Sequence, residues 1–212
     1  MASGLRERRK LETRRAISEI ATALFIERGF DNVTISQVAE TAGVAKMTVT
    51  NYFPRKEDLV FDRADAVAGH LAAVVASRAP GESLLAAIRR DYTESLATAD
   101  GMPVVPGAGF AGLVAGSPAL VSRGLELSYL RERSLGDAIA AETGSDTPEL
   151  RLVAAQLAAP LRVLYDEASR RSLAGQPRKQ IVAALGAAAD HLFGLLEPAL
   201  GQYGSSERRP GS

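Results

Sequence analysis

The chain has 212 residues, of which 46% are hydrophobic and 24% charged, and its 25 basic side chains balance 25 acidic ones. This composition is typical of a globular protein with one large or two small domains. The absence of cysteine excludes a disulfide framework and a thiolate metal site. No apolar run approaches the roughly 20 residues that span a bilayer, and Met1–Arg15 is charged where a signal peptide would be apolar. We therefore expect a cytoplasmic protein that makes no membrane contact.

The first predicted helix follows a basic segment. Residues 1–15 carry six basic and two acidic side chains. Beside a DNA-binding element such a stretch would contact phosphates, whereas elsewhere it would be a solvated, disordered tail. From about Arg8 to Arg28, apolar residues recur every three or four positions, which predicts an amphipathic helix ended by Gly29. Its predicted buried residues are Ile17, Ile20, Ala21, Leu24 and Phe25.

Two short helices separated by a tight turn are predicted between residues 34 and 56. Thr34 is a typical N-cap, because its hydroxyl can accept a backbone N–H of the helix that follows. Gly43 ends that helix, since glycine adopts the left-handed conformation without a Cβ clash. The second helix, about Lys46 to Tyr52, begins within three residues and turns Val49 inward. Helix pairs of this kind place the second helix in a major groove of DNA.

The outward face of that second helix is suited to a polyanion. None of its residues is acidic, and all can hydrogen-bond or pack against phosphates and base edges. They are Lys46, Met47, Thr48, Thr50, Asn51 and Tyr52.

The middle of the chain predicts further helices with one interruption. Pro54 closes the second helix of the pair, and a fourth helix is expected over about 55–78. Another follows over about 82–98. Prolines and glycines then break the pattern over 99–116, so we expect a loop that is either the mobile mouth of a ligand cavity or a long surface connection. A serine cap and a first-turn proline begin a helix over about 117–143.

The last two predicted helices carry apolar stripes. A Thr-Pro-Glu cap begins the first at about residue 147, and a break at Gly175 and Pro177 separates it from the second. The final helix has two apolar faces and therefore needs two partners, one of which is available to another subunit. We predict a homodimer in which these helices form a four-helix bundle. The predicted interface residues are Leu157, Leu161, Leu164, Leu185, Ala188, His191, Leu192 and Leu195.

Between Arg14 and Val60 the chain resembles the TetR family of bacterial transcriptional regulators. The resemblance rests on the type and spacing of Arg14, Ile17, Ala21, Leu24-Phe25, Gly29-Phe30, Thr34, Val38-Ala39, Ala42-Gly43-Val44, Thr48, Asn51-Tyr52-Phe53 and Lys56-Glu57-Asp58-Leu59. It implies a homodimer whose two recognition helices enter successive major grooves of a pseudo-palindromic operator. It also implies that the protein usually acts as a repressor. A small-molecule effector bound in the C-terminal domain would change the separation of the two recognition helices and release the DNA.

The resemblance also assigns DNA contacts to single residues. Phosphate contacts are expected from Thr34, Thr48 and Lys56, and a contact to the DNA backbone from Tyr52. The base-facing positions are Lys46, Met47, Thr50 and Asn51, with further contacts expected from Ser36 and Gln37. Two positions depart from the family pattern. Ala45 stands where a capping serine is usual, and Thr50 where a tyrosine is frequent.

The expected fold is therefore all-α. Residues 1–55 would form the N-terminal arm and the three-helix DNA-binding domain, 56–200 a helical effector-binding and dimerisation domain, and 201–212 a disordered tail.

Candidate residues for the effector pocket are Tyr92, Met102, Phe110, Tyr129 and Tyr165. At the polar positions the alternative is a solvated group beside an ordinary core side chain. The two histidines, His70 and His191, have no cysteines at ligand spacing, so we expect neither a metal nor another cofactor. No HExxH, GxSxG, Walker or paired-carboxylate motif occurs, which weighs against an all-helical enzyme. A regulator that has lost its ligand and binds only DNA or a protein partner remains the other alternative.

Overall fold

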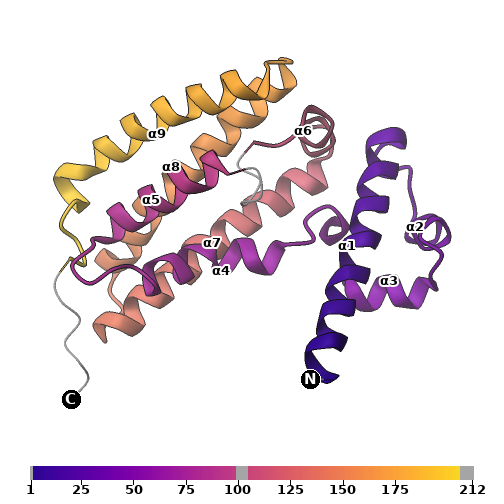
Figure 1. Ribbon diagram of the computed structural model, residues 1–212, viewed down its shortest axis with the longest axis horizontal. Helices are drawn as coiled ribbons and strands as arrows, with labels where there is room; N and C mark the ends of the chain where they lie inside the picture. The colour runs from indigo at the N-terminus through magenta and orange to yellow at the C-terminus, as the bar shows by residue number, and fades with distance from the viewer. Residues whose placement is uncertain (1, 99–104, 206–212) are drawn as a thin grey trace. The chain divides into compact units, whose positions relative to one another are not determined.

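The computed structural model describes residues 2–98 and 105–205, and every regular element in this part of the chain is helical (Figure 1). The prediction of an all-α fold is confirmed. In chain order the elements are α1 (Ala2–Arg28), α2 (Ile35–Thr41), α3 (Lys46–Tyr52), the 3-10 helix η1 (Lys56–Leu59), α4 (Ala64–Ala76), α5 (Leu84–Ala97), α6 (Ala108–Ala115), α7 (Pro118–Thr143), α8 (Pro148–Leu173) and α9 (Arg178–Leu200).

The chain divides into two compact units. Unit 1 comprises the described residues of Met1–Ala64 and Gly109–Gly124, and unit 2 those of Asp65–Ala108 and Leu125–Ser212. This division differs from the predicted boundary after residue 55. Leu59 of η1 is buried in the core of unit 1, and so is Leu120 from the start of α7. Apolar burial therefore joins η1 and a distant segment to the three N-terminal helices.

In α1 the predicted apolar stripe is largely confirmed. Ile17, Ala21, Leu24 and Phe25 are buried, and Ile20 is partly buried against them. The helix begins at Ala2, before the predicted Arg8. It ends before Gly29, whose φ of 87° lies in the left-handed region.

The continuous fourth helix predicted over 55–78 is wrong. The structure has the short 3-10 helix η1, a break, and then α4. The hydroxyl of Ser18 donates a hydrogen bond to the carbonyl oxygen of Leu59 (2.8 Å), and Nε of Arg14 donates to that of Asp62 (3.1 Å). Side chains of α1 thus occupy carbonyl groups that a continuing helix would bond internally.

The loop predicted over 99–116 is wrong for its second half, which contains α6. Gly109, Gly112 and Gly116 favour a loop locally, but Leu113 is buried in the core of unit 1, and packing outweighs propensity here. Residues 99–104, including the pocket candidate Met102, lie outside the described part of the chain.

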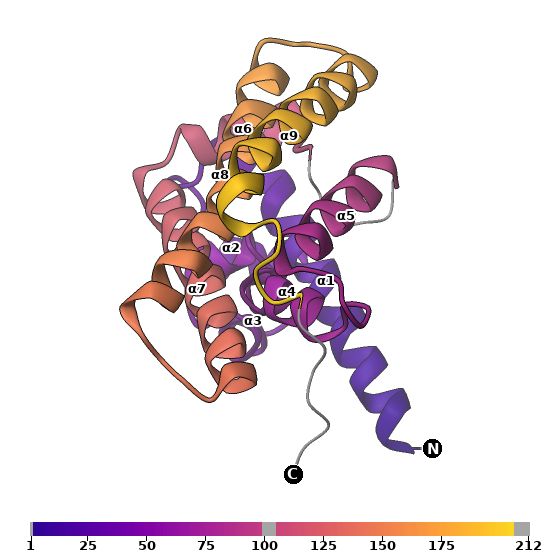
Figure 2. The same ribbon diagram turned by 90° about the vertical axis from the view of Figure 1, so that its left-hand side faces the viewer.

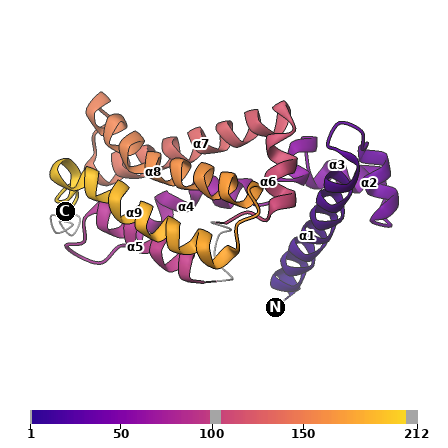
Figure 3. The ribbon, with the colours of Figure 1, turned by 90° about the horizontal axis from the view of Figure 1, so that it is seen from above.

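Unit 2 is built on the contacts that α9 makes with α8 and α5, which run alongside it in Figures 2 and 3. Side-chain caps begin two of these helices as their residue types predict. The hydroxyl of Ser83 accepts the N–H of Ala86 at the start of α5 (3.1 Å), and that of Thr147 accepts the N–H of Leu150 at the start of α8 (3.2 Å).

Three of the predicted dimer-interface residues are buried inside the chain's own core. Leu157, Leu164 and Leu185 have no exposed surface, so they cannot contact a second subunit. The inward face of α9 follows steps of four through Ile181, Leu185, Ala189 and Phe193, whereas the predicted stripe included Ala188 and Leu192. The bulky Phe193 fixes this register, because its ring packs edge-on against Tyr92 at 6.2 Å. Of the remaining predicted residues, Leu161, Ala188 and Leu192 are partly buried, and His191 and Leu195 are exposed.

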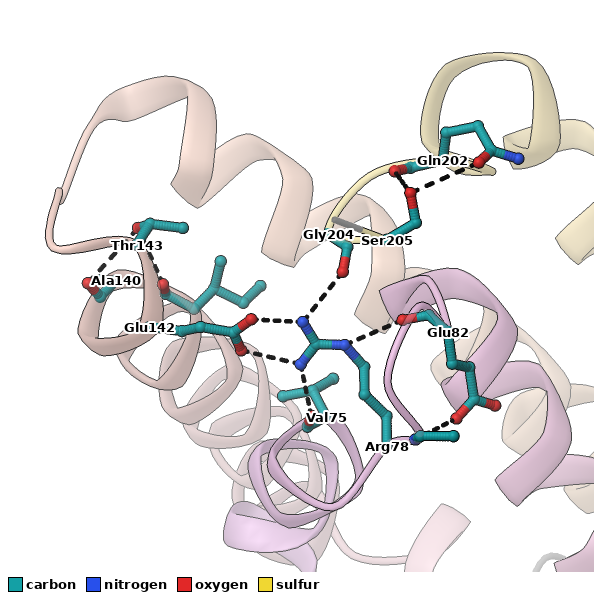
Figure 4. Close-up of polar contacts among 11 residues, drawn as sticks. Val75, Arg78, Glu82, Ala140, Glu142, Thr143, Gln202, Gly204 and Ser205 are labelled. Atoms are coloured by element: carbon teal, nitrogen blue, oxygen red, sulfur yellow. Dashed lines mark hydrogen bonds and ion pairs between the residues drawn. The ribbon is translucent and has the colours of Figure 1, made fainter. Parts of the chain in front are cut away.

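Residues 201–205, predicted to be disordered, form turns that Arg78 binds (Figure 4). All five N–H groups of this buried guanidinium have acceptors. Two go to the carboxylate of Glu142, at 2.8 and 2.5 Å. The other three go to the carbonyl oxygens of Val75, Glu82 and Gly204. The backbone after α9 is thereby tied to α7 and to the loop between α4 and α5. Residues 206–212 lie outside the described part of the chain.

Candidate nucleic-acid interface

The helix α2 begins with a reciprocal cap. The hydroxyl of Thr34 accepts the backbone N–H of Gln37 (3.3 Å), and the side-chain oxygen of Gln37 accepts the N–H of Thr34 (2.8 Å). This capping box satisfies backbone donors at the helix start. The predicted N-cap role of Thr34 is confirmed. The side chains of Thr34 and Gln37 are exposed and hydrogen-bond to each other. Ser36, which lies between them in the sequence, is also exposed.

The turn between α2 and α3 depends on Gly43, whose φ of +66° lies in the left-handed region. The N–H of Val44 donates to the carbonyl oxygen of Ala39 across the turn (3.0 Å). At the start of α3, Ala45 provides no side-chain cap, as its residue type predicts. Val49 is completely buried and anchors α3 in the core of unit 1. The two helices therefore have the helix-turn-helix arrangement that the sequence predicts.

The opposite face of α3 presents side chains that can hydrogen-bond DNA or pack against it. Lys46, Met47 and Asn51 are exposed, and Met47 retains 69% of its surface. Thr48 is half-buried. The half-buried Thr50 donates its hydroxyl to the carbonyl oxygen of Met47 (3.1 Å), so only its oxygen lone pairs remain for a partner. Cationic, amide and apolar groups at these positions are suited to phosphates, purine edges and thymine methyl groups respectively.

The half-buried Tyr52 lies at the end of the same helix. Its ring packs beside the buried Phe53, with ring centres 6.4 Å apart. The carbonyl oxygen of Tyr52 accepts a short hydrogen bond from the guanidinium of Arg14, and that guanidinium also stacks over Phe53 at 4.4 Å. The sequence predicts Arg14 as part of a basic, phosphate-contacting arm. In the structure its guanidinium instead contacts Tyr52 and Phe53 at the end of α3, and so it helps to position that helix.

The ammonium group of Lys56, predicted to contact phosphate, points into unit 1. Its Nζ donates to the carbonyl oxygen of Phe30 (2.5 Å) and lies over the rings of Phe30 and Phe25, at 4.3 and 5.5 Å. Burial lowers the pKa of Lys56 below its usual value. In the DNA-free chain this ammonium is therefore held by a carbonyl oxygen and two aromatic faces, and the phosphate contact stays a prediction.

Other basic side chains near the start of α1 are exposed. Arg8 pairs with Glu12, and Arg15 with Glu19, each one helical turn apart. Arg9 and Lys10 are also exposed. Ion pairs of this kind contribute little to stability, so these residues remain available to a polyanion.

The described pocket candidates are divided between the two units. Tyr92 is buried in unit 2, and burial raises its pKa to about 12. Tyr165 is half-buried in the same unit, and burial raises its pKa as well. Tyr129 is 59% exposed on α7, and its place in a pocket stays a prediction. Phe110 packs edge-on against Phe61 within unit 1, at 6.3 Å, and so it belongs to the other unit.

Sequence reasoning missed Arg131 of α7. Apolar residues recur every four positions along one face of this helix, at Leu127, Leu135 and Ile139, and all three are buried. Arg131 occupies the remaining position of that stripe, and its Nε is buried without a hydrogen-bond partner. A charged residue at the four-residue spacing of a core stripe is the signal that could have identified it.

Titratable clusters elsewhere in the described residues are small. His70 and Asp91 form a pair across α4 and α5, at 2.7 Å. Within residues 2–98 and 105–205, no group of three His, Cys, Asp or Glu side chains could hold a metal ion.

Two comparisons identify the family of the chain. Residues 17–62 match the family model described as "Bacterial regulatory proteins, tetR family". The HTH-type transcriptional regulator TcmR of Streptomyces glaucescens is 30% identical over 148 residues, which cover 68% of this chain and 66% of that relative, just under two thirds of its length. The chain belongs to the TetR family. All the predicted DNA-contacting residues lie within the TetR family match, whereas the pocket candidates lie outside it.

Solved structures of a repressor and of another transcriptional regulator share the fold. NalD of Pseudomonas aeruginosa, the secondary repressor of the MexAB-OprM multidrug efflux pump, is 17% identical, with a TM-score of 0.52 over 89% of this chain and 95% of that one. FadR of Bacillus subtilis, in complex with stearoyl-CoA, is 14% identical, with a TM-score of 0.52 over 84% of this chain and 97% of that one. At these identities the likeness establishes the fold alone.

Proposed function

We propose that this protein is a cytoplasmic, homodimeric TetR-type repressor, which binds a pseudo-palindromic DNA operator and releases it when a small-molecule effector binds unit 2. The observation that carries this proposal is the outward face of α3. It combines Lys46, Met47 and Asn51 on a helix that Val49 anchors from behind. Membership of the TetR family supports the assignment of this face to DNA.

Binding energy would come mainly from phosphate contacts, and specificity from the few base-facing side chains. Lys46 is the exposed cation of α3, and Arg9 and Lys10 extend the positive charge along α1. Asn51 has the donor and acceptor pair that recognises an adenine edge, and Met47 is suited to a thymine methyl group. Thr34, Ser36, Gln37, Thr48, Thr50 and Tyr52 are proposed as supporting contacts.

The exposed faces of α8 and α9 support a homodimer. On α9, small residues and one histidine follow one another in steps of three and four, at Ala183, Ala187, His191, Gly194 and Pro198. On α8, Leu152, Val163 and Leu173 are exposed in spite of their size. Among the described helices, α9 alone is long and apolar enough to cross a membrane by length and composition, and little of it is buried. Pairing with a second copy would cover this surface in a four-helix bundle.

Unit 2 is the proposed effector-binding part of the chain. It contains the buried hydroxyl of Tyr92, which has no hydrogen-bond partner among the described residues, and the half-buried ring of Tyr165. FadR, whose fold is similar, was solved with stearoyl-CoA, so this fold can hold a bound small molecule. Release of DNA then requires an effector that binds the DNA-free conformation more tightly than the DNA-bound one.

A mobility-shift titration of the full chain tests the proposal. The probes would be short segments of the DNA that flanks its own gene, each paired with a scrambled segment of equal length and composition. We expect one pseudo-palindromic segment to bind at least 1,000-fold more tightly than its scrambled control, with an affinity that falls steeply as salt rises. Equal binding to every segment, or none at all, would refute the proposal.

A further inference from the structure

Arg131 occupies a position in unit 2 where the helix pattern calls for an apolar side chain. It lies one turn from Leu127 and one turn from Leu135 on the same face of α7, and Ile139 continues that face. Leu135 and Ile139 belong to the main hydrophobic core of unit 2. The guanidinium group is therefore carried at the edge of an apolar interior.

One donor of this guanidinium has no acceptor in the described part of the chain. Its Nε is buried and unpartnered, while the residue as a whole is half-buried. Burial lowers the pKa of its side chain. Arg78, in the same unit, is the contrasting case, because each of its N–H groups has an oxygen partner. A buried N–H without an acceptor is costly, so a ligand oxygen that accepts it and balances the charge of Arg131 would bind favourably.

A second unsatisfied group lies in the same unit. The hydroxyl of Tyr92 on α5 is buried without a partner, and its ring belongs to the hydrophobic core that contains Leu135. Among the described residues, these two side chains carry the buried side-chain N and O atoms that lack partners, and unit 1 carries none. Both therefore lie in the unit assigned to the effector.

We propose that unit 2 binds an organic carboxylate with an apolar body, and that its carboxylate pairs with Arg131. This inference rests on the proposed function and names the chemical class of its effector. The planar guanidinium matches a carboxylate with two parallel hydrogen bonds. The neighbouring leucines suit a hydrocarbon or aromatic body. A single guanidinium balances one negative charge, whereas a phosphate monoester would bring surplus charge into apolar surroundings.

The test uses the full chain, isothermal titration calorimetry and two pairs of probes. Decanoate is compared with decanamide, and 2-naphthoate with 2-naphthamide, so that each pair shares its apolar body and differs in charge. The variants are Arg131→Met, which keeps the length and removes the charge, and Arg133→Met, a control two residues away on the exposed face of α7. Unfolding midpoints without ligand establish that each variant folds.

We expect at least one carboxylate to bind about 10- to 100-fold more tightly than its amide, which is the range of a charge-assisted hydrogen bond. Arg131→Met should remove this difference, and Arg133→Met should retain it. The unfolding midpoint of Arg131→Met should equal or exceed that of the unsubstituted chain, because no internal partner is lost.

Several results would overturn the assignment. They are equal binding of carboxylate and amide, binding by neither carboxylate, an equal loss in both variants, or a large fall in the ligand-free midpoint of Arg131→Met. The last would mean that Arg131 has a structural partner within the chain. Operator binding is measured separately on the unsubstituted chain, so failure of the repressor proposal would appear there and leave the carboxylate titration unaffected.

Discussion

Lys56 donates a hydrogen bond to the carbonyl oxygen of Phe30 and lies 4.3 Å from the centre of the same residue's ring. The contact ties η1 to the loop that follows α1, 26 residues earlier in the chain. Both elements flank the α2–α3 pair, so Lys56 helps to hold the frame of the helix-turn-helix.

We predict that Lys56→Met lowers the free energy of unfolding of unit 1 by about 2 kcal/mol, because a hydrogen bond from a charged group and two cation–π contacts are lost. Urea denaturation of the full chain measures this change. In DNA titrations, the slope of log affinity against log salt should stay that of the unsubstituted chain. A slope flatter by about one with unchanged stability would instead mean that Lys56 contacts phosphate.

Lys46 is expected to behave in the opposite way. It is exposed on α3 at a position that the family resemblance makes base-facing, so Lys46→Gln should leave the unfolding free energy unchanged and weaken binding to the operator more than binding to its scrambled control. The salt slope should become flatter by about one. A mobility-shift series at several salt concentrations, with Lys56→Met measured in parallel, separates the two roles. An unchanged slope for Lys46→Gln would remove it from the interface.

The missing cap of α3 offers a stabilising substitution. Ala45 is exposed and makes no side-chain cap bond. Ala45→Ser should raise the unfolding free energy by about 1 kcal/mol, because a serine hydroxyl can accept a backbone N–H of the first turn. Thr34→Ala, which removes the existing cap of α2, should lower it by a similar amount. A shift of the urea midpoint in the same direction by both substitutions would contradict the prediction, because it would mean that helix capping does not determine the stability of this helix pair.

The ion pair between Arg78 and Glu142 should stabilise the turns that follow α9. The side chain of Arg78 is only 3% exposed, so Glu142→Gln leaves a buried cation partly unpaired and should cost about 3 kcal/mol. The amide of Leu84, which donates to the carbonyl oxygen of Tyr203, should then exchange hydrogen faster. Glu94→Gln, which removes an exposed ion pair, serves as the control and should have little effect. Equal effects of the two variants would contradict the prediction.

A charge on the exposed face of α9 should separate the proposed dimer. Leu195 is 63% exposed, and Leu125 of α7 is 59% exposed, so each tolerates glutamate in a single chain. We expect Leu195→Glu to give a monomer in sedimentation equilibrium, since an unpaired charge would be buried between copies, and Leu125→Glu to remain a dimer. The reverse result would place the dimer contact on α7.

The parts of the fold that the sequence predicts well are those decided within a few residues. Thr34 and Gln37 lie three positions apart and form their cap whatever the rest of the chain does. Gly43 supplies the left-handed turn by itself. Val49 is the buried residue of α3, and this helix is too short to bury a second apolar face. Local chemistry is sufficient at these positions.

Prediction failed where a partner came from far along the chain. The break after η1 depends on Ser18 and Arg14, more than 40 residues earlier. The inward direction of Lys56 depends on Phe30. The inner face of α9 is set by the large Phe193, whereas counting apolar residues favoured a neighbouring face. A periodic pattern shows that a helix has an apolar face, but the volume of the side chains decides which one is buried.

The ion pair between Asp58 and Arg123, with both side chains nearly buried, spans 65 residues within unit 1. A fragment that stops at Ala64 would keep every predicted DNA contact and still lose Arg123 together with Leu113 and Leu120. Such a fragment would leave Asp58 uncompensated and part of the apolar core open to water. The DNA-binding half of this protein is therefore not a separable piece of sequence, and swapping it between relatives requires moving α6 and the first turns of α7 with it.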